Sequence, residues 1–486
     1  MMDGDCFGAP CTGMEAKRIE NHQGLVLCRV NKSPCNGLFL SGAAMNRREF
    51  VAKSTCALSS LAAPSIIRAS ALGAKAPSNR INVGFIGTGR QAFGANLPQM
   101  MAVPGVQVVA VCDVDGWRMT EAQAFVNSFY AKRDGLASYK GCRPLSDFRE
   151  VIADRDIDAL MISTPDHWHV PMGIAAAKAK KHFALEKPIS LSVQQGRLLA
   201  DAVKQAGVTA RTDSEARSIR VHNHAVELVR NGRIGKLERI EMVLPFDPAP
   251  VGAQPDMPVP PELNYDMWLG PAVVVPYTEK RVHDVKQHHL RPNWMRVSTY
   301  AQGMISNWGA HLFDLVQWAM DTEHSGPVEV DGRGEFPASL WNTMVNFKVH
   351  YRYANGVEMT CEQTPTSEAS LSFFGSDAWI RIDGWGGTMT SSKPELVNLA
   401  PEPGEMDLSK TLWDKNDFIA AIREGRQTLE PIEVGHRTIS ISQIGHIACE
   451  VQEKLRWNPE KEAFEGNNYA NALLAAPLTR AQWVIS

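Results

Sequence analysis

Between residues 80 and 212 the chain alternates short apolar runs with longer stretches of mixed polarity. The apolar runs are rich in β-branched residues and predict strands over 81–86, 106–112, 157–163, 182–185 and 208–210. The stretches between them predict helices over 91–103, 117–133, 146–153, 170–180 and 192–206. Strands that alternate with helices build a parallel sheet, so this part of the chain is expected to be a doubly wound α/β domain.

The pattern changes beyond residue 212, where we place a domain boundary. After a helix expected over 215–231, longer alternating runs predict a large open, mostly antiparallel sheet, with strands over 237–244, 343–353, 357–362, 371–374 and 379–382. Further helices are expected over 305–320, 413–424 and 436–455. Residues 245–276 are rich in proline and predict a long ordered loop, which in compact proteins is usually functional. Residues 213–486 are therefore predicted to be an α+β domain for substrate binding and oligomerisation.

Composition narrows the class of partner. The 486 residues are 44% hydrophobic and 21% charged, and 50 basic against 53 acidic side chains give a formal charge of −3. This balance predicts no general attraction to nucleic acid or to an anionic membrane, so the expected partner is a small molecule. Nine cysteines without a CxxC pair do not describe a disulfide scaffold or a zinc site, and those in the body of the chain are expected to be buried thiols.

The first 79 residues carry a different signal. Residues 1–44 lack periodicity and are predicted to be disordered, or to precede a true start at Met45. Residues 45–79 then combine the pair Arg47-Arg48, an apolar stretch from Cys56 to Ile67 and several small residues. This order resembles a twin-arginine signal peptide, and its apolar stretch is too short to span a bilayer. Export to a bacterial periplasm without stable membrane insertion is the expectation; a surface helix is the alternative.

The first predicted strand runs into a glycine-rich turn. Residues 87–92, Gly-Thr-Gly-Arg-Gln-Ala, combine a first glycine for the sharp turn, a second for close approach of a pyrophosphate, and a small third residue that packs the helix on the strand. Asp113 ends the second strand, where a dinucleotide fold places the acid that binds a ribose. We therefore predict an NAD site, with NADP kept open by Arg118. The alternative is a tight turn in a nucleotide-free sheet.

Two further segments follow predicted strands: Thr-Pro-Asp-His-Trp-His, residues 164–169, after the strand over 157–163, and Glu-Lys-Pro, residues 186–188, after the strand over 182–185. Ligands bind beyond the carboxyl ends of the strands in such sheets, so both are expected on the rim that holds Gly87 and Asp113. Lys187 would there aim its ammonium at a substrate oxygen, although a solvated lysine is the alternative. The predicted cofactor-binding residues are Gly87, Thr88, Gly89, Arg90, Gln91, Ala92, Asp113, Thr164, Pro165, His167, Glu186 and Lys187.

A second candidate cluster lies on the helix expected over 305–320. Asn307, His311 and Asp314 are spaced to form one polar stripe beside an apolar stripe. Histidine suits proton transfer because its ordinary pKa lies near neutrality. A solvated face is the alternative interpretation of this stripe.

With the glycine turn, Asp113, the segment TPDHWH, the segment EKP and the helix of Asn307 and His311 in one order, the chain resembles the Gfo/Idh/MocA oxidoreductases over residues 80 to 460. The resemblance implies a Rossmann domain, a second domain on a large open sheet, NAD(P), and sugars or polyols as substrates. It implies that Lys187 and His311 are catalytic and that Asp314 binds substrate. Asn307 stands where sugar and inositol dehydrogenases usually carry aspartate, which implies a weaker base and slow turnover.

The first function that this resemblance implies is an NAD(P)-dependent dehydrogenase of a sugar, sugar acid or cyclitol, with Lys187, His311 and Asn307 at the reacting centre. The second is an NAD-dependent glycosidase with a bound, recycled cofactor, and the third is a weakly catalytic or non-catalytic nucleotide-binding protein. The predicted substrate-binding residues are Asp314, Trp294, His167 and Trp168. The histidine pairs 167/169 and 222/224 lack companion ligands, so no metal is predicted. A homo-oligomer is expected because open antiparallel sheets often pair.

Overall fold

The computed structural model describes residues 80–247, 249–365, 368–477 and 479–483. All of them belong to one compact unit, Ile67–Ser486. The predicted disordered segment 1–44 and the predicted signal peptide 45–79 lie outside the described residues.

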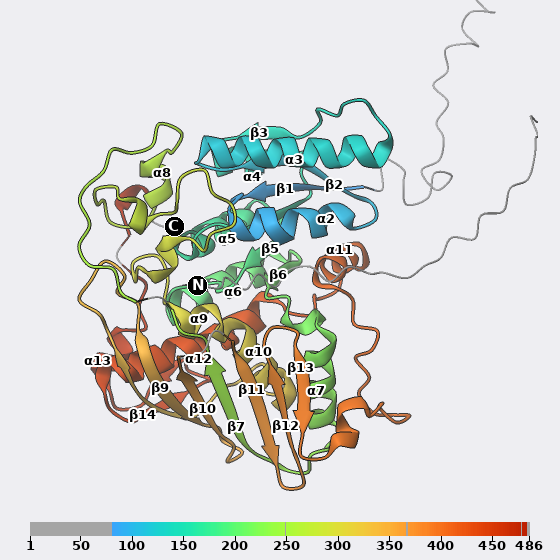
Figure 1. The fold of residues 1–486 in the computed structure, drawn as a ribbon, viewed down its shortest axis with the longest axis vertical. Coiled ribbons are helices and arrows are strands. Elements are labelled where there is room, and N and C mark those ends of the chain that lie inside the picture. Colours follow the sequence, from blue (N-terminus) through green and yellow to red (C-terminus); the bar gives the residue numbers. More distant parts are fainter. Residues whose placement is uncertain (1–79, 248, 366–367, 478, 484–486) are drawn as a thin grey trace, which may run out of the picture. The chain divides into compact units, whose positions relative to one another are not determined.

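The first sheet is parallel throughout, as predicted, with strand order β3-β2-β1-β4-β5-β6 (Figure 1). Its strands are almost entirely apolar and buried, as is usual for a sheet covered on both faces by helices. The strands are β1 (Ile81–Ile86), β2 (Val106–Cys112), β3 (Arg143–Leu145), β4 (Ala159–Ile162), β5 (His182–Glu186) and β6 (Ala210–Asp213). The short edge strand β3 escaped prediction because its three residues carry no apolar run.

Helices cover this sheet where the sequence predicts them: α2 (Leu97–Ala102), α3 (Gly116–Asp134), α4 (Phe148–Ala153), α5 (His169–Lys178) and α6 (Val193–Ala206). Several ends are fixed by local chemistry. The Asp115 carboxylate accepts from the N–H groups of Trp117 and Arg118 in the first turn of α3, and Gly135 ends that helix in the left-handed conformation. Strand β6 ends at Asp213, so the segment predicted as a domain boundary is the last strand of the first sheet.

The second sheet has nine strands in the order β13-β12-β11-β7-β10-β9-β8-β14-β15. Every pairing is antiparallel except β7 with β10, which confirms the predicted mostly antiparallel class. Its strands are β7 (Leu237–Leu244), β8 (Glu329–Glu335), β9 (Val345–Arg352), β10 (Glu358–Gln363), β11 (Ser370–Gly375), β12 (Trp379–Asp383), β13 (Thr388–Ser391), β14 (Leu455–Asn458) and β15 (Ala463–Phe464). Strand β9 buries alternate residues, so one of its faces packs on the core and the other meets solvent.

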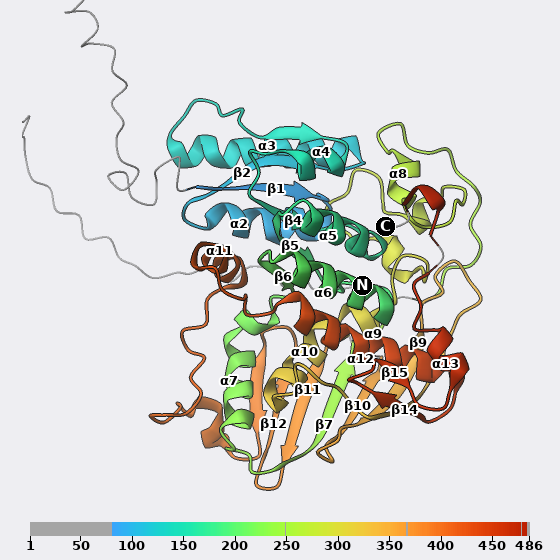
Figure 2. The same cartoon turned by 180° about the vertical axis from the view of Figure 1, so that it is seen from behind.

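Helices line the covered face of the second sheet (Figure 2). They are α7 (Arg220–Arg230), α9 (Met304–Asn307), α10 (Gly309–Met320), α12 (Ile432–Val451) and the short α13 (Asn468–Ala472). The helix predicted over 215–231 is interrupted, because a 3₁₀ turn over Ala216–Ser218 is followed by Ile219 in an extended conformation. The helix predicted over 305–320 is divided between α9 and α10.

The chain returns from the second sheet to the first. Helix α11 (Asp414–Glu424) places Phe418 and Ile419 in the same core cluster as Val83 and Phe85 of β1. Arg211 of β6 also forms an isolated bridge with Pro431. The first sheet is therefore completed by residues that the sequence assigns to the second domain.

The described residues of the proline-rich loop, which exclude residue 248, are ordered and extend to residue 302. It contains α8 (Tyr265–Leu269) and the 3₁₀ turns Glu279–Arg281 and Asn293–Arg296. Leu263, Trp268, Tyr277, Val282 and Tyr300 give it a small core of its own. The loop is thus a packed substructure, which allows it to hold side chains in fixed positions.

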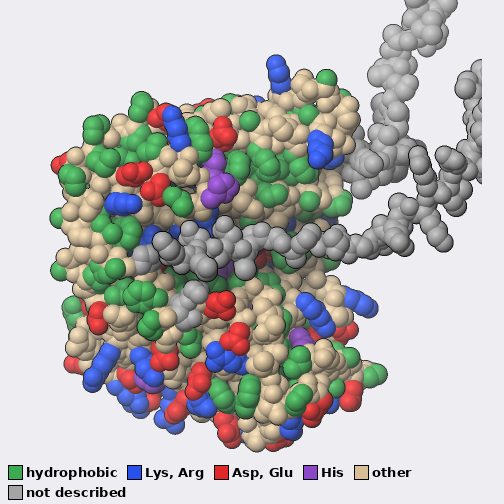
Figure 3. All heavy atoms as spheres, in the orientation of Figure 1, with side chains coloured by type: hydrophobic (Ala, Val, Ile, Leu, Met, Phe, Trp, Pro, Cys, Tyr) green, Lys and Arg blue, Asp and Glu red, His purple; other side chains and the backbone are tan. Residues whose placement is uncertain are grey.

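Basic and acidic side chains are interspersed on the face shown in Figure 3, most densely over the part built on the second sheet. Cys112, Cys142, Cys361 and Cys449 are buried free thiols, as expected. Within the described part of the chain, none of the helices is long and apolar enough to cross a bilayer.

Candidate functional site

The glycine turn after β1 has the geometry that a dinucleotide requires. Gly87 has a φ of +87°, and a Cβ there would lie 2.5 Å from the backbone oxygen of Ser163, so only glycine fits. A Cβ on Gly89 would instead meet only Arg118, at 3.9 Å. The turn is therefore tight against β4 on one side and open on the other, where a diphosphate can approach the backbone.

The helix after the turn begins at Arg90 and contains a π-helical segment, Ala92–Asn96. Ala92 is fully buried, in agreement with its predicted role as the small packing residue. The first N–H groups of a helix have no intrahelical acceptors, so the N–H groups of Gly89, Arg90 and Gln91 are available to phosphate oxygens. The described residues of this turn thus fit the pyrophosphate of NAD.

Asp113 occupies the position expected for the ribose-binding acid. Its carboxylate accepts from the Thr88 N–H at 2.7 Å, from the Thr88 hydroxyl at 2.9 Å and from the Asp115 N–H at 2.9 Å. A carboxylate offers about four acceptor sites, so one remains for a ribose hydroxyl. The buried Thr164 hydroxyl, with no hydrogen-bond partner among the described residues, is a further group that a cofactor could satisfy.

Arg118 is engaged by other groups of the chain. Its guanidinium lies 3.6 Å from the Asp115 carboxylate and donates to the backbone oxygen of Gln287 at 2.7 Å, and the residue is buried. These contacts partly compensate the charge of Arg118, which favours NAD, and the possibility of NADP stays a prediction.

A strap from the second domain, residues 283–291, crosses the glycine turn and α3. Its His288 ring stacks on Phe93 at a centroid distance of 4.0 Å and on Trp117 at 4.6 Å. The backbone oxygen of His289 accepts from Arg90 at 3.3 Å. Sequence reasoning did not find this strap because its contacts join segments that are far apart in the chain.

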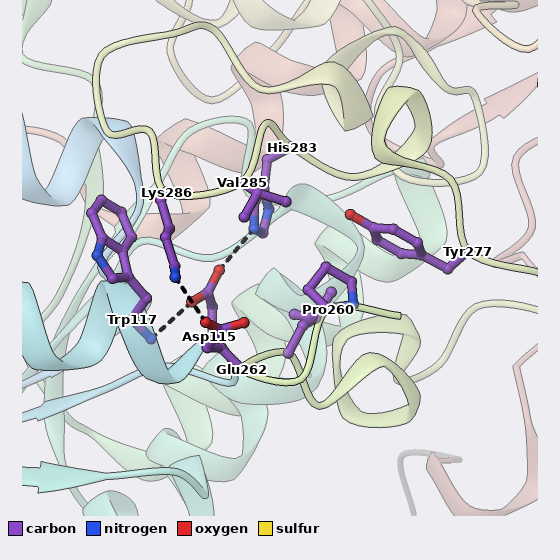
Figure 4. A pocket seen from close by; sticks show the side chains of 9 residues that line it. Asp115, Trp117, Pro260, Glu262, Tyr277, His283, Val285 and Lys286 are labelled. Carbon is purple, nitrogen blue, oxygen red and sulfur yellow. Dashed lines mark hydrogen bonds and ion pairs between the residues drawn. The ribbon is translucent and has the colours of Figure 1, made fainter. Parts of the chain in front are cut away.

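A pocket lies beside the strap (Figure 4). His283 lies 3.1 Å from the Asp115 carboxylate, and Lys286 pairs with Glu262 at 3.1 Å across the pocket. These contacts join the N-terminus of α3 to the proline-rich loop. The pocket therefore lies at the edge of the first sheet that carries the glycine turn and Asp113, here called the nucleotide edge. It does not belong to the reacting centre, the region around Lys187 and His311.

Lys187 joins the two domains at the reacting centre. It follows the last residue of β5, and its Nζ donates to the backbone oxygen of Asn307 at 3.2 Å, one turn before His311. Burial lowers the pKa of Lys187, while the carboxylates of Glu186 and Asp166 oppose this effect. The structure therefore brings Lys187 to the last residue of α9, four residues before His311 of α10.

His311 lies on the first turn of α10 with its Nδ1 3.1 Å from the hydroxyl of Ser214, which follows β6. Burial lowers the pKa of His311 well below its ordinary value, and the positive charge of Lys187 lowers it further. The imidazole is therefore neutral at physiological pH and can accept a proton. Ser214, which was not predicted, orients it.

Carboxyl groups surround Lys187 on the rim of the first sheet. Burial raises the pKa of Asp166 well above its ordinary value, and burial together with Asp213 raises the pKa of Glu186 to about 8. Glu186 also accepts from the amide of Asn96 at 2.8 Å. Neither Asp166 as a neighbour of Lys187 nor Asn96 as a partner of Glu186 was predicted.

Glu215 adds an unusual carboxyl group next to Ser214. It adopts a φ of +63°, which is rare for a residue with a side chain, and lies 3.8 Å from the buried Nζ of Lys415. Burial raises the pKa of Glu215 to about 7. Backbone strain of this kind clusters at functional sites.

Asp314 does not face the site. Both of its carboxylate oxygens accept from Arg217, at 2.6 and 2.7 Å, and the side chain is fully buried. The prediction that Asp314 binds substrate is therefore wrong in this geometry, because the carboxylate is already used in a buried ion pair. Asn307 and His311 of the same predicted stripe are half-buried at the junction with Lys187.

Trp168 is also a structural residue. It is 3% exposed, its Nε1 donates to the Trp268 backbone oxygen at 3.0 Å, and a Cβ on Gly270 would collide with its ring. The predicted contact of Trp168 with substrate is therefore wrong. His167 is buried as well, with Nε2 3.1 Å from the same oxygen, which leaves Nδ1 for a ligand. Trp294 is half-buried against the core of the proline-rich loop.

The ring nitrogens of the paired histidines contact backbone oxygens. Both ring nitrogens of His169 face backbone oxygens, of Pro188 at 2.7 Å and Thr164 at 2.9 Å, and His222 Nδ1 lies 3.0 Å from the Ala216 oxygen. Among residues that the structure describes, no group of three metal-ligating side chains occurs.

The arrangement supports acid–base chemistry at a hydroxyl group. The neutral imidazole of His311 can accept the hydroxyl proton, while the ammonium of Lys187 stabilises negative charge on the oxygen. NAD, when bound, supplies a hydride acceptor. The two side chains come from different domains, so the fold as a whole assembles the site.

Comparison with known proteins identifies the class and then the family. Residues 81–214 match the model of an oxidoreductase family described as NAD-binding Rossmann fold, and residues 251–485 match the C-terminal alpha/beta domain of an oxidoreductase family. The chain thus has the two domains of an oxidoreductase family, an NAD-binding Rossmann domain and a C-terminal alpha/beta domain. The chain belongs to the Gfo/Idh/MocA family.

Two relatives match part of the chain. An uncharacterized oxidoreductase of Rhizobium meliloti is 32% identical over 166 residues, which are 34% of this chain and 45% of that protein. An alpha-N-acetylgalactosaminidase of Shewanella oneidensis is 31% identical over 169 residues, which are 35% of this chain and 36% of that protein. The chain thus aligns with less than half the length of each relative.

A solved structure confirms the architecture. The WlbA dehydrogenase of Bordetella pertussis, in complex with NADH and UDP-GlcNAcA, superposes with a TM-score of 0.57 at 17% identity, covering 78% of this chain and 99% of that one. At this identity the likeness establishes the fold.

Proposed function

We propose that this protein oxidises a hydroxyl group of a sugar, sugar acid or cyclitol and transfers the hydride to NAD. The observation that carries the proposal is the contact of Lys187 with Asn307, four residues before His311, on the sheet edge that holds the glycine turn. A half-buried neutral imidazole near an ammonium suits removal of a proton from an alcohol. The carbohydrate ligand of the WlbA structure supports the substrate class.

The test is a panel of sugars, sugar acids and cyclitols incubated with NAD and the purified protein, with NADH absorbance as the readout. Reduction of NAD by at least one member, abolished in His311→Ala, supports the proposal. A panel without any turnover would favour the weakly catalytic alternative, which Asn307 suggests because an amide cannot share the proton.

A second candidate is an NAD-dependent glycosidase that oxidises its substrate transiently and keeps its cofactor. Two observations favour it: the similarity to an alpha-N-acetylgalactosaminidase, and the strap whose His288 stacks between Phe93 and Trp117 over the nucleotide edge. Such a strap would slow cofactor exchange, which a recycled cofactor tolerates. Aryl glycosides without added nucleotide separate the candidates, since release of phenol without net NADH identifies the glycosidase.

Export and assembly remain proposals from the sequence. We propose that residues 45–79 direct twin-arginine export to a periplasm, with support from the pair Arg47-Arg48. Replacement of both arginines by lysine is expected to retain the protein in the cytoplasm in a fractionation experiment. A homo-oligomer is proposed from the open sheet, and a monomer mass in light scattering would contradict it.

A further inference from the structure

Trp385 lies against the candidate base. It belongs to the turn that joins β12 and β13, and its ring centroid is 4.4 Å from that of His311 and 5.8 Å from that of Trp308. The indole is nevertheless 37% exposed. A ring that touches His311 and also meets solvent forms an open wall of the reacting centre.

The position of Trp385 is fixed by its surroundings. Gly384 and Gly386 on either side have φ values of +72° and +66°, which make the turn tight. The buried ring of His222 meets the indole edge-on at 5.5 Å, and its own Nδ1 is held by the Ala216 oxygen. Trp385 is therefore placed by packing rather than left as a loose surface side chain.

We propose that Trp385 and Trp308 form an aromatic corner that binds the C–H face of a six-membered sugar or cyclitol ring and presents one of its hydroxyl groups to His311. The two indoles meet at 83°, so a flat ring that stacks on one has its edge against the other. The face of an indole is electronegative and attracts polarised C–H groups. The inference rests on the proposed function and narrows it to rings with mostly equatorial hydroxyl groups.

The chain offers a matched control. Trp379 begins β12, is 36% exposed, and among the described residues makes no aromatic ring contact comparable to those of Trp385. It lies at the opposite end of the strand from Trp385. If KM depended only on exposed indole surface, Trp385→Ala and Trp379→Ala would change it equally. If Trp385 contacts the substrate, only Trp385→Ala would raise KM.

The test compares steady-state kinetics of the wild type, Trp385→Ala, Trp385→Phe and Trp379→Ala with NAD and with cyclic (glucose, galactose, myo-inositol) and acyclic (sorbitol) substrates. Trp385→Ala is expected to raise KM for the cyclic substrates roughly fivefold with little change for sorbitol, since an aromatic contact contributes about 1 kcal/mol. Trp385→Phe is expected to recover part of the loss. Indole fluorescence should respond to cyclic ligands in the wild type and Trp379→Ala, and less strongly in Trp385→Ala, where Trp308 is the remaining indole of the corner.

Equal KM values for Trp385→Ala and Trp379→Ala would overturn the inference while leaving the proposed function intact. An equal loss for cyclic and acyclic substrates would also overturn it, since Trp385 would then only support His311. A wild-type protein that oxidises no member of the wider panel of sugars, sugar acids and cyclitols would refute the proposed function, and the aromatic corner with it.

Discussion

The hydroxyl of Ser214 lies 3.1 Å from Nδ1 of His311 and connects the end of β6 to the first turn of α10. Ser214 is fully buried, so water does not compete for this contact. A hydrogen bond to one ring nitrogen fixes the orientation of an imidazole and leaves the other nitrogen directed at the site. The first sheet thereby positions the base that the second domain supplies.

Ser214→Ala is therefore expected to lower kcat about fivefold with little change in KM, since a hydrogen bond contributes about 1 kcal/mol. Ser218→Ala is the matched control, because its hydroxyl bonds only weakly to the Leu412 oxygen at 3.4 Å, away from His311. Kinetics of both variants, with circular dichroism to verify folding, test the role. Equal kcat in Ser214→Ala and the wild type would remove Ser214 from the site.

Lys187→Met is expected to lower kcat by about 10²- to 10⁴-fold, because the charge beside the reacting oxygen is lost. Lys181→Met serves as the comparison: its Nζ donates to the backbone oxygens of Asp154 and Ile157 at the start of β4. Single-turnover formation of NADH measures the chemical step. If both substitutions reduce the rate alike, Lys187 has a structural role only.

The sequence predicted the nucleotide edge well because each of its groups follows a strand of unmistakable pattern. Gly87, Asp113 and Lys187 directly follow β1, β2 and β5, and the carboxyl ends of parallel strands share one edge. Ser214 and Glu215 follow β6 in the same way, so their place on this edge could have been predicted. The change of pattern near residue 212 instead indicates a domain boundary, which hides the end of the sixth strand.

Other residues depend on contacts that spacing does not encode. Asp314 shares a helical stripe with His311, but its partner Arg217 lies far away in sequence, and only the fold reveals that the pair is buried. Trp385 stands in the segment Gly384-Trp385-Gly386-Gly387, where a large apolar residue at the tip of a glycine-rich turn was an available signal. Its contact with His311 required the hairpin to fold back over α10.

The pair of Asp314 and Arg217 gives a prediction on stability rather than on substrate binding. Asp314→Asn is expected to lower the free energy of unfolding by about 3 kcal/mol, since the buried guanidinium of Arg217 loses its bidentate partner and keeps its ion pair with Glu323. Asp321→Asn is the control, because Asp321 pairs with Arg230 at 2.8 Å but is 73% exposed, and such pairs contribute less than about 1 kcal/mol. Urea denaturation compares the two. An unchanged stability with a raised KM in Asp314→Asn would restore the substrate-binding role.

The ion pair between Arg118 and Asp115 predicts a preference for NAD over NADP. Because Asp113 repels a 2′-phosphate and Arg118 is engaged with Asp115, calorimetry is expected to show NAD binding at least about tenfold tighter than NADP. Asp113→Asn is expected to weaken the binding of NAD and so to reduce the difference in affinity between NAD and NADP. If Arg118→Met selectively weakens NADP, the arginine does recognise the phosphate and the assignment fails.

Glu215 predicts a dependence of stability on pH. Burial raises its pKa to about 7 from an ordinary 4.5, with Lys415 opposing and Asp414 and Asp213 reinforcing the shift. The folded state therefore binds this proton more tightly than the unfolded chain, so the contribution of Glu215 to stability falls as pH rises from about 4.5 to 7 and stays low above that range. Gln99, on α2, also bonds to this carboxyl group.

Glu215→Gln mimics the protonated carboxyl group, so the variant does not lose this contribution to stability as the pH rises. The variant and the wild type are expected to have similar free energies of unfolding near pH 4, whereas above pH 7 the variant is expected to be more stable by about 1–2 kcal/mol, a value reduced for the partial exposure of the side chain. Urea denaturation at several pH values measures the difference, and Glu368→Gln in the loop before β11 supplies a comparison at a site away from Lys415. A stability difference that does not change with pH would mean that Glu215 is ionised throughout, with Lys415 outweighing its burial.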